Sequence, residues 1–590
     1  MSTPRRNRES DAVPPTSTNF ETVISEWIAE DEYLSSGESM FSDSDESYMP
    51  LEAEKNTSES NSYEEDSSCE DEGETSLFQS QQSSTDDVFV SPNGSVWSKA
   101  TPSQGRARVH NVIKFQPGPS RGVTTANLKD AWDYFIPQVI VEEIQRCTNL
   151  EAKRVSLEKR KKWQCISIAE MNAFLGILLH AGADKNWDVP IREIFLGNYA
   201  NPVYRATMSV NRFEDIRRYL RFDDRRTRQD RLQTDNLAHI SYVWEVFIQQ
   251  CRRVFVINEH ATIDEQLVSF RGRCKFKQYM PSKPGKYGLK IFWMCESSSG
   301  YAIDGMIYTG RKIGEPPQKD IAMNTVKRLV ETITNSSRNV TMDNFFTSVP
   351  LARYLLDRRL TLVGTMRENK RDIPAEFKSN NAVDVYSSKF GFQNDMTLVS
   401  YVPKRRKSVV LLSTMHHNKI IEESTMKKKP EIVIFYNKTK GGVDVMDQKV
   451  NNYTCKRQTK RWPMALWCNI MDIAALNAFI LYQWQHPNFY PKISHKRRLF
   501  LKELSMEMMK PYMMERSTKA SLQRSIRMDI EKFLGEAIPA NSDNKEKRLT
   551  MKKRCCVCPS SKDRKVMTTC CKCNKHVCKE HSILICENCR

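Results

Sequence analysis

The sequence predicts a multidomain α/β protein with an acidic, disordered N-terminal region, a mostly helical region, a region of strands alternating with helices, and a cysteine-rich tail. Three observations predict this division. Residues 1–90 hold 23 Asp or Glu and 4 Lys or Arg, whereas the rest of the chain holds 49 acidic and 86 basic residues. The hydrophobic period changes from helical to strand-like near residue 261. Nine of the 17 cysteines lie in the last 36 residues.

Residues 1–112 are predicted to be disordered, because Ser, Thr, Asp and Glu dominate and apolar side chains are too sparse to offset chain entropy. The run Ser42-Asp43-Ser44-Asp45-Glu46-Ser47 fits a site for an acid-directed kinase, but also a plain solvated tail. The basic remainder has the charge expected of a protein that neutralises phosphate groups, although many basic proteins are merely soluble. The acidic region is a candidate to fold back on that basic body.

The segment 113–259 is predicted to be mostly helical. Ser167 and Glu170 predict a capping box ahead of a helix over 171–180. A later helix opens near Asn211 and ends in a run of arginines, which usually indicates a solvated basic face. The arginines are Arg217, Arg218, Arg221, Arg225, Arg226 and Arg228. A long apolar helix, Leu466–Gln483, is predicted to be core and belongs with the segment 455–530.

From residue 260 to 373 the pattern indicates strands separated by helices, which predicts a central sheet with helical layers. The expected strands are Ala261–Phe270, Gly288–Cys295, Tyr301–Tyr308, Asn339–Met342 and Leu360–Met366, and the expected helices are Asp320–Thr334 and Val349–Arg358. Strand-like pieces at Met396–Val402 and Ser408–Thr414 predict an inserted subdomain over 374–430. A further strand is expected at Glu431–Tyr436, followed by a helix over Val443–Tyr453.

Three aspartates stand out in this region. Asp264 lies in a β-branched strand, Asp343 ends a second strand, and Asp444 follows a Gly-Gly break at the start of a helix. Clustered carboxylates repel one another when ionised, and hard cations such as Mg²⁺ prefer oxygen ligands. The three are therefore predicted to hold two catalytic Mg²⁺ ions, with Mn²⁺ as a possible substitute, at a site that cuts DNA. Any one of them alone would more often be a turn or cap residue.

Asp447 lies three residues after Asp444, so both face the same side of a helix. It is predicted to be an auxiliary ligand or a group that orients its neighbours.

Five strings resemble the piggyBac family of DNA transposases: IDEQLVSFRGR, KYGLKIFWMCES, TMDNFFTSVPLA, YNKTKGGVDVMDQ and RWPMALW. The resemblance runs in the same order from about Thr125 to Arg590 and includes the cysteine-rich tail. It implies an RNase H-like catalytic domain over 260–373 and 431–454, and a helical dimerisation and DNA-binding domain over 113–259 and 455–530.

The same resemblance implies a cut-and-paste transposase acting on double-stranded DNA as a homodimer. Such an enzyme binds the terminal inverted repeats, excises the element through hairpin ends and integrates it at TTAA. The alternative is a domesticated protein that binds DNA but does not transpose. A ubiquitin ligase or histone reader, suggested by the tail alone, would not need the aspartates.

Basic side chains near the first aspartate are candidate phosphate contacts, although a solvated face fits equally well. They are Arg271, Arg273, Lys283, Lys286 and Lys290. By resemblance, Arg367 and Lys370 match positions that help hold target DNA. Trp462 matches a tryptophan beside the active site that could stack on an unpaired base, the alternative being a core residue.

The tail contains the pattern Cys555-x2-Cys558-x11-Cys570-x2-Cys573-x4-Cys578-x2-His581-x4-Cys586-x2-Cys589. Eight such ligands suffice for two structural Zn²⁺ ions, and the segment is too short to build a core without metal. A cross-braced arrangement would join the first and third ligand pairs, and the family uses this module to recognise terminal DNA. The preceding linker, 531–554, ends in a basic cluster that suits a nuclear localisation signal or a phosphate contact, so a nuclear location is expected.

Overall fold

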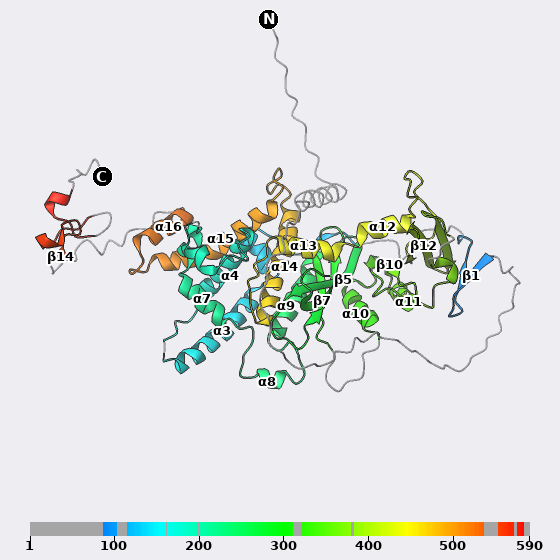
Figure 1. The fold of residues 1–590 in the computed structure, drawn as a ribbon, viewed down its shortest axis with the longest axis horizontal. Helices are drawn as coiled ribbons and strands as arrows, with labels where there is room; N and C mark the ends of the chain where they lie inside the picture. The colour runs from blue at the N-terminus through cyan, green and yellow to red at the C-terminus, as the bar shows by residue number, and fades with distance from the viewer. Residues whose placement is uncertain are drawn as a thin grey trace, which may run out of the picture. The chain divides into compact units, whose positions relative to one another are not determined.

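A computed structural model describes residues 87–102, 115–310, 320–378, 383–535, 553–570 and 575–582, apart from positions 161, 199 and 282 (Figure 1). The predictions for residues 1–86 lie outside these ranges. The chain divides into two compact units. An insertion unit comprises Met1–Arg108, Thr347–Leu356 and Thr361–Tyr436, and a main unit comprises Val109–Phe346, Asp357–Leu360 and Asn437–Arg590.

The main unit contains a mixed sheet whose central strand is β5 (His260–Ser269). β5 pairs antiparallel with β7 (Tyr287–Glu296) and parallel with β9 (Asn339–Met342). β7 also pairs with β6 (Gln278–Tyr279) and β8 (Ala302–Ile307). The strands predicted from the sequence in this region are confirmed to within a residue at each end. The parallel pair requires a crossover, and α10 (Ile321–Leu329) with a 3₁₀ turn at Val330–Ile333 lies within it.

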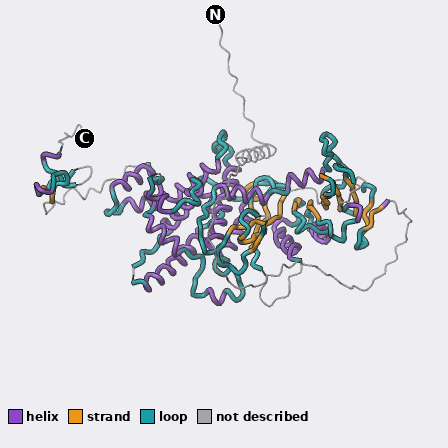
Figure 2. The backbone as a smooth tube through the Cα atoms, viewed as in Figure 1, coloured by secondary structure: helices purple, strands orange, loops and turns teal. Residues whose placement is uncertain are grey.

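Helices make up most of the main unit outside this sheet (Figure 2). Before β5 they are α2 (Leu128–Asp133), α3 (Gln138–Glu158), α4 (Ile168–Ala183), α5 (Ile191–Leu196), α6 (Pro202–Thr207), α7 (Val210–Tyr219), α8 (Arg228–Arg231) and α9 (Ser241–Val254). After the insertion unit they are α13 (Gly442–Asn452), α14 (Trp462–Gln485), α15 (Lys496–Ser517) and α16 (Arg524–Leu534). Short ribbons β3 (Gly118–Pro119) with β4 (Phe255–Val256), and β14 (Lys553–Arg554) with β15 (Lys565–Val566), complete the unit.

The predicted core helix is α14. In the described part of the chain it is the one helix long and apolar enough to cross a membrane, yet its apolar window is entirely buried inside the protein. The helix therefore serves as the packing centre of the main unit.

The capping box predicted for α4 is only half formed. Ser167 Oγ accepts a hydrogen bond from the Glu170 backbone N–H at 3.0 Å, as expected. The Glu170 carboxylate instead forms a 2.7 Å ion pair with Arg212 and accepts a 2.8 Å bond from the Tyr512 hydroxyl. A buried carboxylate gains more from a guanidinium than from a backbone N–H, so tertiary packing overrides the local motif.

The insertion unit is built on an antiparallel sheet in the order β1-β2-β11-β12-β13-β10. Its strands are β1 (Val88–Val90), β2 (Val96–Ser98), β10 (Thr361–Met366), β11 (Ser388–Gln393), β12 (Met396–Lys404) and β13 (Lys407–Ser413). Its helical segments are α11 (Val349–Asp357), a 3₁₀ turn at Ala375–Phe377 and the first part of α12 (Glu431–Thr439). The unit is thus larger than the predicted insertion over 374–430, because it takes in β10 and the N-terminal hairpin.

The predicted disorder over 1–112 is wrong for residues 87–102. Strands β1 and β2 form a hairpin there, and β2 pairs with β11. Trp97 is fully buried and its indole N–H lies 3.2 Å from the Asp372 carbonyl and 3.1 Å from Ser91 Oγ. The composition of the region did not predict this ordered hairpin, because a single buried residue, Trp97, attaches it to the rest of the unit.

The strand predicted at Glu431–Tyr436 is also wrong, because this segment is the start of helix α12. Its run of β-branched and aromatic residues favours a strand by propensity. In the structure Ile432 and Val433 are buried in a core cluster with Val363 and Phe390, and this packing selects the helix.

Candidate active site

The register of two parallel strands places two of the predicted aspartates side by side. Ile263 on β5 pairs with Met342 on β9. Asp264 is the next residue of β5, and Asp343 is the first residue after β9. Neighbouring strands lie about 4.8 Å apart, so the two side chains leave the sheet as neighbours. Burial, followed by the charges of Glu265 and Asp343, raises the pKa of Asp264 to about 7.

A buried hydroxyl network lies beneath these carboxylates. Thr262 Oγ1 donates to the Thr439 carbonyl at 2.6 Å and lies 2.8 Å from Ser297 Oγ. Thr341 Oγ1 lies 2.8 Å from Thr439 Oγ1. Thr262 and Thr341 stand two residues before Asp264 and Asp343, hence on the same faces of their strands. The network therefore ties both aspartate strands to the chain that leads into α13.

Gly442 allows α13 to approach β5 closely. A Cβ atom at this position would lie 2.6 Å from Thr262 Oγ1 and 3.1 Å from the Glu296 carbonyl. The adjacent Gly441 has no such neighbour within 4 Å. The Gly-Gly break thus brings the first turn of α13, which carries Asp444, onto the strand that carries Asp264.

Asp444 faces a lysine in this structure. Its side chain is 69% exposed and Oδ1 lies 3.8 Å from Lys283 Nζ, which also donates to the Glu265 carbonyl at 3.1 Å. In the described part of the chain no three Asp or Glu side chains have their oxygens within 4.8 Å of one another. The structure therefore brings Asp264 and Asp343 together, with Asp444 on an adjacent helix and paired to a cation of the chain.

Asp447 is held by a glutamine rather than directed at Asp444. Gln266 Nε2 donates to Asp447 Oδ1 at 2.7 Å, and Gln266 Oε1 accepts from the Trp293 indole at 3.0 Å and from Asn469 at 2.9 Å. Gln266 is 2% exposed, and burial raises the pKa of Asp447. These contacts hold the Asp447 carboxylate in place one helical turn from Asp444.

Sequence reasoning missed Gln266 and the threonine network. The available signal was spacing: a threonine stands two residues before each of the two strand aspartates, and Gln266 stands two residues after Asp264. Each shares a face with its aspartate, but the pattern does not reveal which hydroxyls meet across strands.

A second cluster of possible ligands lies in the tail. Cys555, Cys558, Cys578 and His581 have all their ligand atoms within 4.8 Å of one another. Cys558 Sγ lies 3.7 Å from Cys578 Sγ, and His581 Nδ1 lies 3.2 to 3.8 Å from the three sulfurs. Tetrahedral Zn²⁺ with ordinary bond lengths requires separations of about 3.6 to 3.8 Å.

Backbone N–H groups, that of Val557 first, lower the pKa of the Cys555 thiol to about 5, which favours the thiolate that a metal binds. The cluster joins the first and third predicted ligand pairs and fits zinc. Cys570 packs against it, whereas Cys573, Cys586 and Cys589 lie outside the described residues.

Comparison with known proteins agrees with this geometry. A sequence model described as Transposase IS4 matches residues 129–479. A cryo-EM structure of a piggyBac transposase synaptic complex with hairpin DNA is similar, with a TM-score of 0.71 and 37% identity over 81% of this chain and 100% of that chain. The chain belongs to the piggyBac transposase family. Human relatives are more distant: PiggyBac transposable element-derived protein 3 is 23% identical over 388 residues, which is 60% of each chain. The derived protein 2 is 22% identical over 358 residues, or 58% of its length.

The basic residues predicted to contact DNA occupy three settings in this piggyBac family member. Arg271, Arg273 and Lys286 are exposed near the ends of β5 and β7, whereas Arg367 and Lys370 belong to the insertion unit. Lys290 is half-buried, with its ammonium 4.7 Å from the Phe292 ring centroid and 5.0 Å from that of Phe345. Burial lowers its pKa, while the charges of Glu265, Asp343 and Asp264 oppose the shift.

Trp462 begins α14 and is neither fully buried nor fully exposed. Its ring meets Phe276 edge-on at 5.1 Å and His239 at 5.2 Å. The indole is therefore held in place by two rings from separate loops, which suits a fixed surface for a planar group.

Proposed function

We propose that the protein is a cut-and-paste DNA transposase with an RNase H-like catalytic core. It would bind terminal inverted repeats, excise the element through hairpin ends and join it to TTAA target DNA. The observation that carries this proposal is the parallel register that sets Asp264 beside Asp343, with the helix of Asp444 docked on the same strand through Gly442.

Asp264, Asp343 and Asp444 would hold two Mg²⁺ ions, or Mn²⁺ in their place. The fit rests on the charge of the site: neighbouring carboxylates repel one another, and Lys283 and Lys290 offset only part of that charge. When bound, the ions supply electrostatic stabilisation at the scissile phosphate. The chain itself positions the ligands, because the threonine network fixes both strands and Gln266 fixes Asp447.

The proposed partner is double-stranded DNA, both at transposon ends and at the target, bound by a homodimer in the nucleus. The similar piggyBac transposase structure is a synaptic complex with hairpin DNA. The main unit carries exposed Arg271, Arg273 and Lys286 near β5 and β7. The tail would hold two structural Zn²⁺ ions and recognise terminal DNA, as its Cys3His cluster supports for one ion.

A plasmid excision assay in cells, paired with end-DNA binding in vitro, tests this function. Replacing Asp264 with Asn should abolish excision and leave binding unchanged, because the amide removes one charge and little volume. Exposed Asp188 provides the control, and Asp188→Asn should excise like the parent chain. Excision that survives Asp264→Asn would refute the assignment. A parent chain that binds ends but never excises would instead indicate the domesticated, DNA-binding alternative.

A further inference from the structure

A cavity of about 330 Å³ lies in the main unit between the segment after α7 and the start of α14. One wall carries arginines, and the other carries rings and a proline. The residues that matter here are Arg221, Arg225, Arg228, His239, Trp462 and Pro463. A recess with cationic and planar walls is unusual for a structural void, which is normally apolar.

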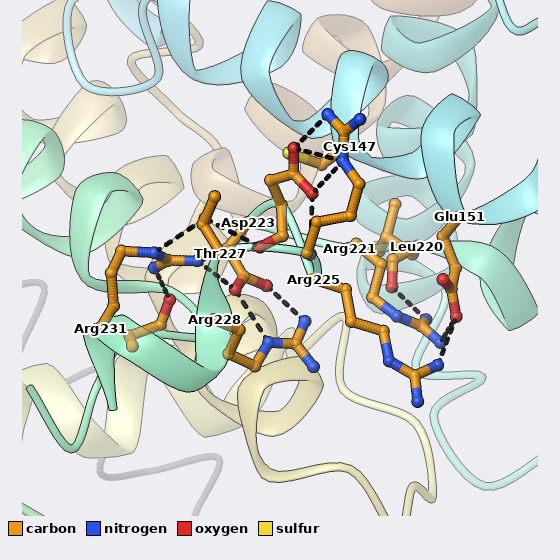
Figure 3. A network of polar contacts seen from close by, with 12 residues as sticks. Cys147, Glu151, Leu220, Arg221, Asp223, Arg225, Thr227, Arg228 and Arg231 are labelled. Atoms are coloured by element: carbon orange, nitrogen blue, oxygen red, sulfur yellow. Dashed lines mark hydrogen bonds and ion pairs between the residues drawn. The ribbon is translucent and has the colours of Figure 1, made fainter. Parts of the chain in front are cut away.

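Two buried carboxylates, Glu151 and Asp223, form ion pairs with the arginines after α7, as Figure 3 shows. Glu151 on α3 lies 2.9 Å from Arg221 and 3.5 Å from Arg225. Asp223 lies 2.5 Å from Arg228 and 2.7 Å from Arg231. Glu151 also pairs with Arg154 at 2.9 Å, so two carboxylates meet five guanidinium groups and an excess of positive charge remains.

Arg461 adds a further cation. Its guanidinium donates to the backbone carbonyls of Arg217, Arg218 and Leu220, and no ion pair joins it to a carboxylate among the described residues. Burial, then repulsion from Arg221 and Arg228, lowers its pKa to about 10. Such a desolvated excess of charge is relieved when an anion enters.

His239 leaves an unsatisfied polar atom at the same recess. Its Nδ1 is buried and has no hydrogen-bond partner in the described part of the chain. Burial and the nearby arginines lower its pKa to about 4, so the ring is neutral. A neutral imidazole beside Trp462 offers a ligand a planar surface.

The cavity is joined to the catalytic strand. The loop after β5 passes so close to Lys460 that a Cβ on Gly272 would lie 2.7 Å from its carbonyl. Phe276 of that loop packs on Trp462. A DNA strand reaching Asp264 would therefore have this recess within a few residues of its path.

We propose that the cavity binds one nucleotide unit of an unpaired DNA strand, with its phosphodiester held by Arg221, Arg225 and Arg228. Guanidinium forks match phosphate oxygens. Arg221 and Arg225 share Glu151, and Arg228 shares Asp223 with Arg231, so each keeps donors for a further anion. The rings of His239 and Trp462 provide a surface for a base or sugar. In a duplex the bases are stacked and paired, so a duplex phosphate would enter the recess without its base. This inference rests on the proposed function, because it assumes that DNA is the substrate.

The test measures binding of the full chain to two fluorescent probes, with Ca²⁺ in place of Mg²⁺ so that no chemistry intervenes. One probe is a blunt duplex, and the other is the same duplex with an unpaired single-stranded tail. The test variant is Arg225→Ala, whose side chain is 57% exposed, so that Arg221 and Arg154 still neutralise Glu151. The matched control is Arg226→Ala, the adjacent arginine, which is 74% exposed, pairs with Asp224 and lies outside the cavity lining.

Arg225→Ala should weaken binding of the tailed probe about tenfold and leave the blunt duplex within about twofold. The slope of log K against log salt for the tailed probe should fall by about 0.7, the value for one phosphate contact on a single strand. Arg226→Ala should change neither. Removing the base at the tail position nearest the duplex should weaken binding of the parent chain and of Arg225→Ala by similar factors, because the base contacts the rings and Arg225 contacts the phosphodiester.

Equal losses on both probes would overturn the proposal in favour of an ordinary duplex contact. Equal losses for both variants would indicate a diffuse basic face, and no loss would show that the cavity is not used. None of these outcomes touches the proposed function, which depends on excision and its loss in Asp264→Asn.

Discussion

Replacing Gly442 with Ala tests whether the docking of α13 sets the catalytic geometry. The new Cβ would lie 2.6 Å from Thr262 Oγ1, 3.0 Å from Thr262 Cβ and 3.1 Å from the Glu296 carbonyl. Thr262 is 1% exposed and its hydroxyl is held by two hydrogen bonds, so it has little freedom to turn away. The helix must therefore move by roughly 0.5 to 1 Å to restore van der Waals contact.

The magnitudes for stability and activity differ. Overpacking costs about 1 to 3 kcal/mol, and replacing Gly by Ala within a helix returns about 1 kcal/mol, so the net loss of unfolding free energy is about 0 to 2 kcal/mol. A displacement near 1 Å at a catalytic group lowers the rate by about 100-fold. The expected variant is folded but cleaves DNA about 10 to 100 times more slowly than the parent.

Thermal unfolding by circular dichroism and single-turnover nicking of an end-DNA duplex provide the two measurements. Gly441→Ala is the matched control, since a Cβ there has nothing within 4 Å. It should melt and cleave like the parent chain. The reasoning fails if the Gly442 variant cleaves as fast as the Gly441 variant, or if it loses activity only in proportion to lost folded protein.

Three further predictions concern metals and the N-terminal hairpin. The pKa of Asp264 is raised from 3.8 to about 7, so the folded chain without divalent ions binds this proton more tightly than the unfolded chain. The melting temperature of the metal-free chain should therefore rise as pH falls from 8 towards 5, and added Mg²⁺ should stabilise the chain more at pH 8 than at pH 6. Asp264→Asn should remove both effects. A Mg²⁺ effect that does not depend on pH would contradict the argument. Cys558→Ser should lose about one equivalent of zinc by metal analysis, because one ligand of four is removed, whereas exposed Cys556→Ser should retain it. Deleting residues 1–102 removes the buried Trp97 and should lower the melting temperature of the insertion unit, with a loss of about 3 to 5 kcal/mol in unfolding free energy. Deleting residues 1–86 should leave the melting temperature unchanged. Equal melting temperatures for the two deletions would show that the hairpin does not stabilise the unit.

The sheet of the main unit was predictable because its strands are short segments rich in β-branched and apolar residues, and their length separates them from helices. Glu431–Tyr436 shows the limit of this reasoning. Its residues favour a strand locally, and only the core around Val363 and Phe390, distant in sequence, makes it a helix. Trp97 shows the same limit, since its burial depends on partners more than 270 residues away.

The site was predictable to the level of its carboxylates but not of their surroundings. The motifs identified Asp264, Asp343 and Asp444 as candidates. The parallel pairing of β5 with β9 was not predicted, because β6, β7, β8 and α10 lie between the two strands in the chain. That Lys283 would face Asp444, and that Gln266 would hold Asp447, depends on a loop and a helix whose approach is set by side-chain packing. Spacing along the chain does not encode those contacts.

The main unit holds two opposite charge imbalances that are joined by one loop. At the strand ends, carboxylates exceed the lysines that face them; burial, with the charges of Glu265 and Asp343, raises the pKa of Asp264. In the cavity, guanidinium groups exceed their two carboxylates; burial, with repulsion from Arg221 and Arg228, lowers the pKa of Arg461. Each imbalance is costly in the free protein, and each would be relieved by one component of the proposed complex.

Divalent cations would neutralise the carboxylates, and phosphates would neutralise the arginines. Because the loop from Phe270 to Phe276 contacts both regions, DNA held in the cavity would be fixed relative to the strand of Asp264. Cation and DNA binding should therefore be mutually favourable. Mg²⁺ titrations followed by melting temperature should show tighter apparent Mg²⁺ binding with the tailed probe than without it, and Arg225→Ala should reduce that difference.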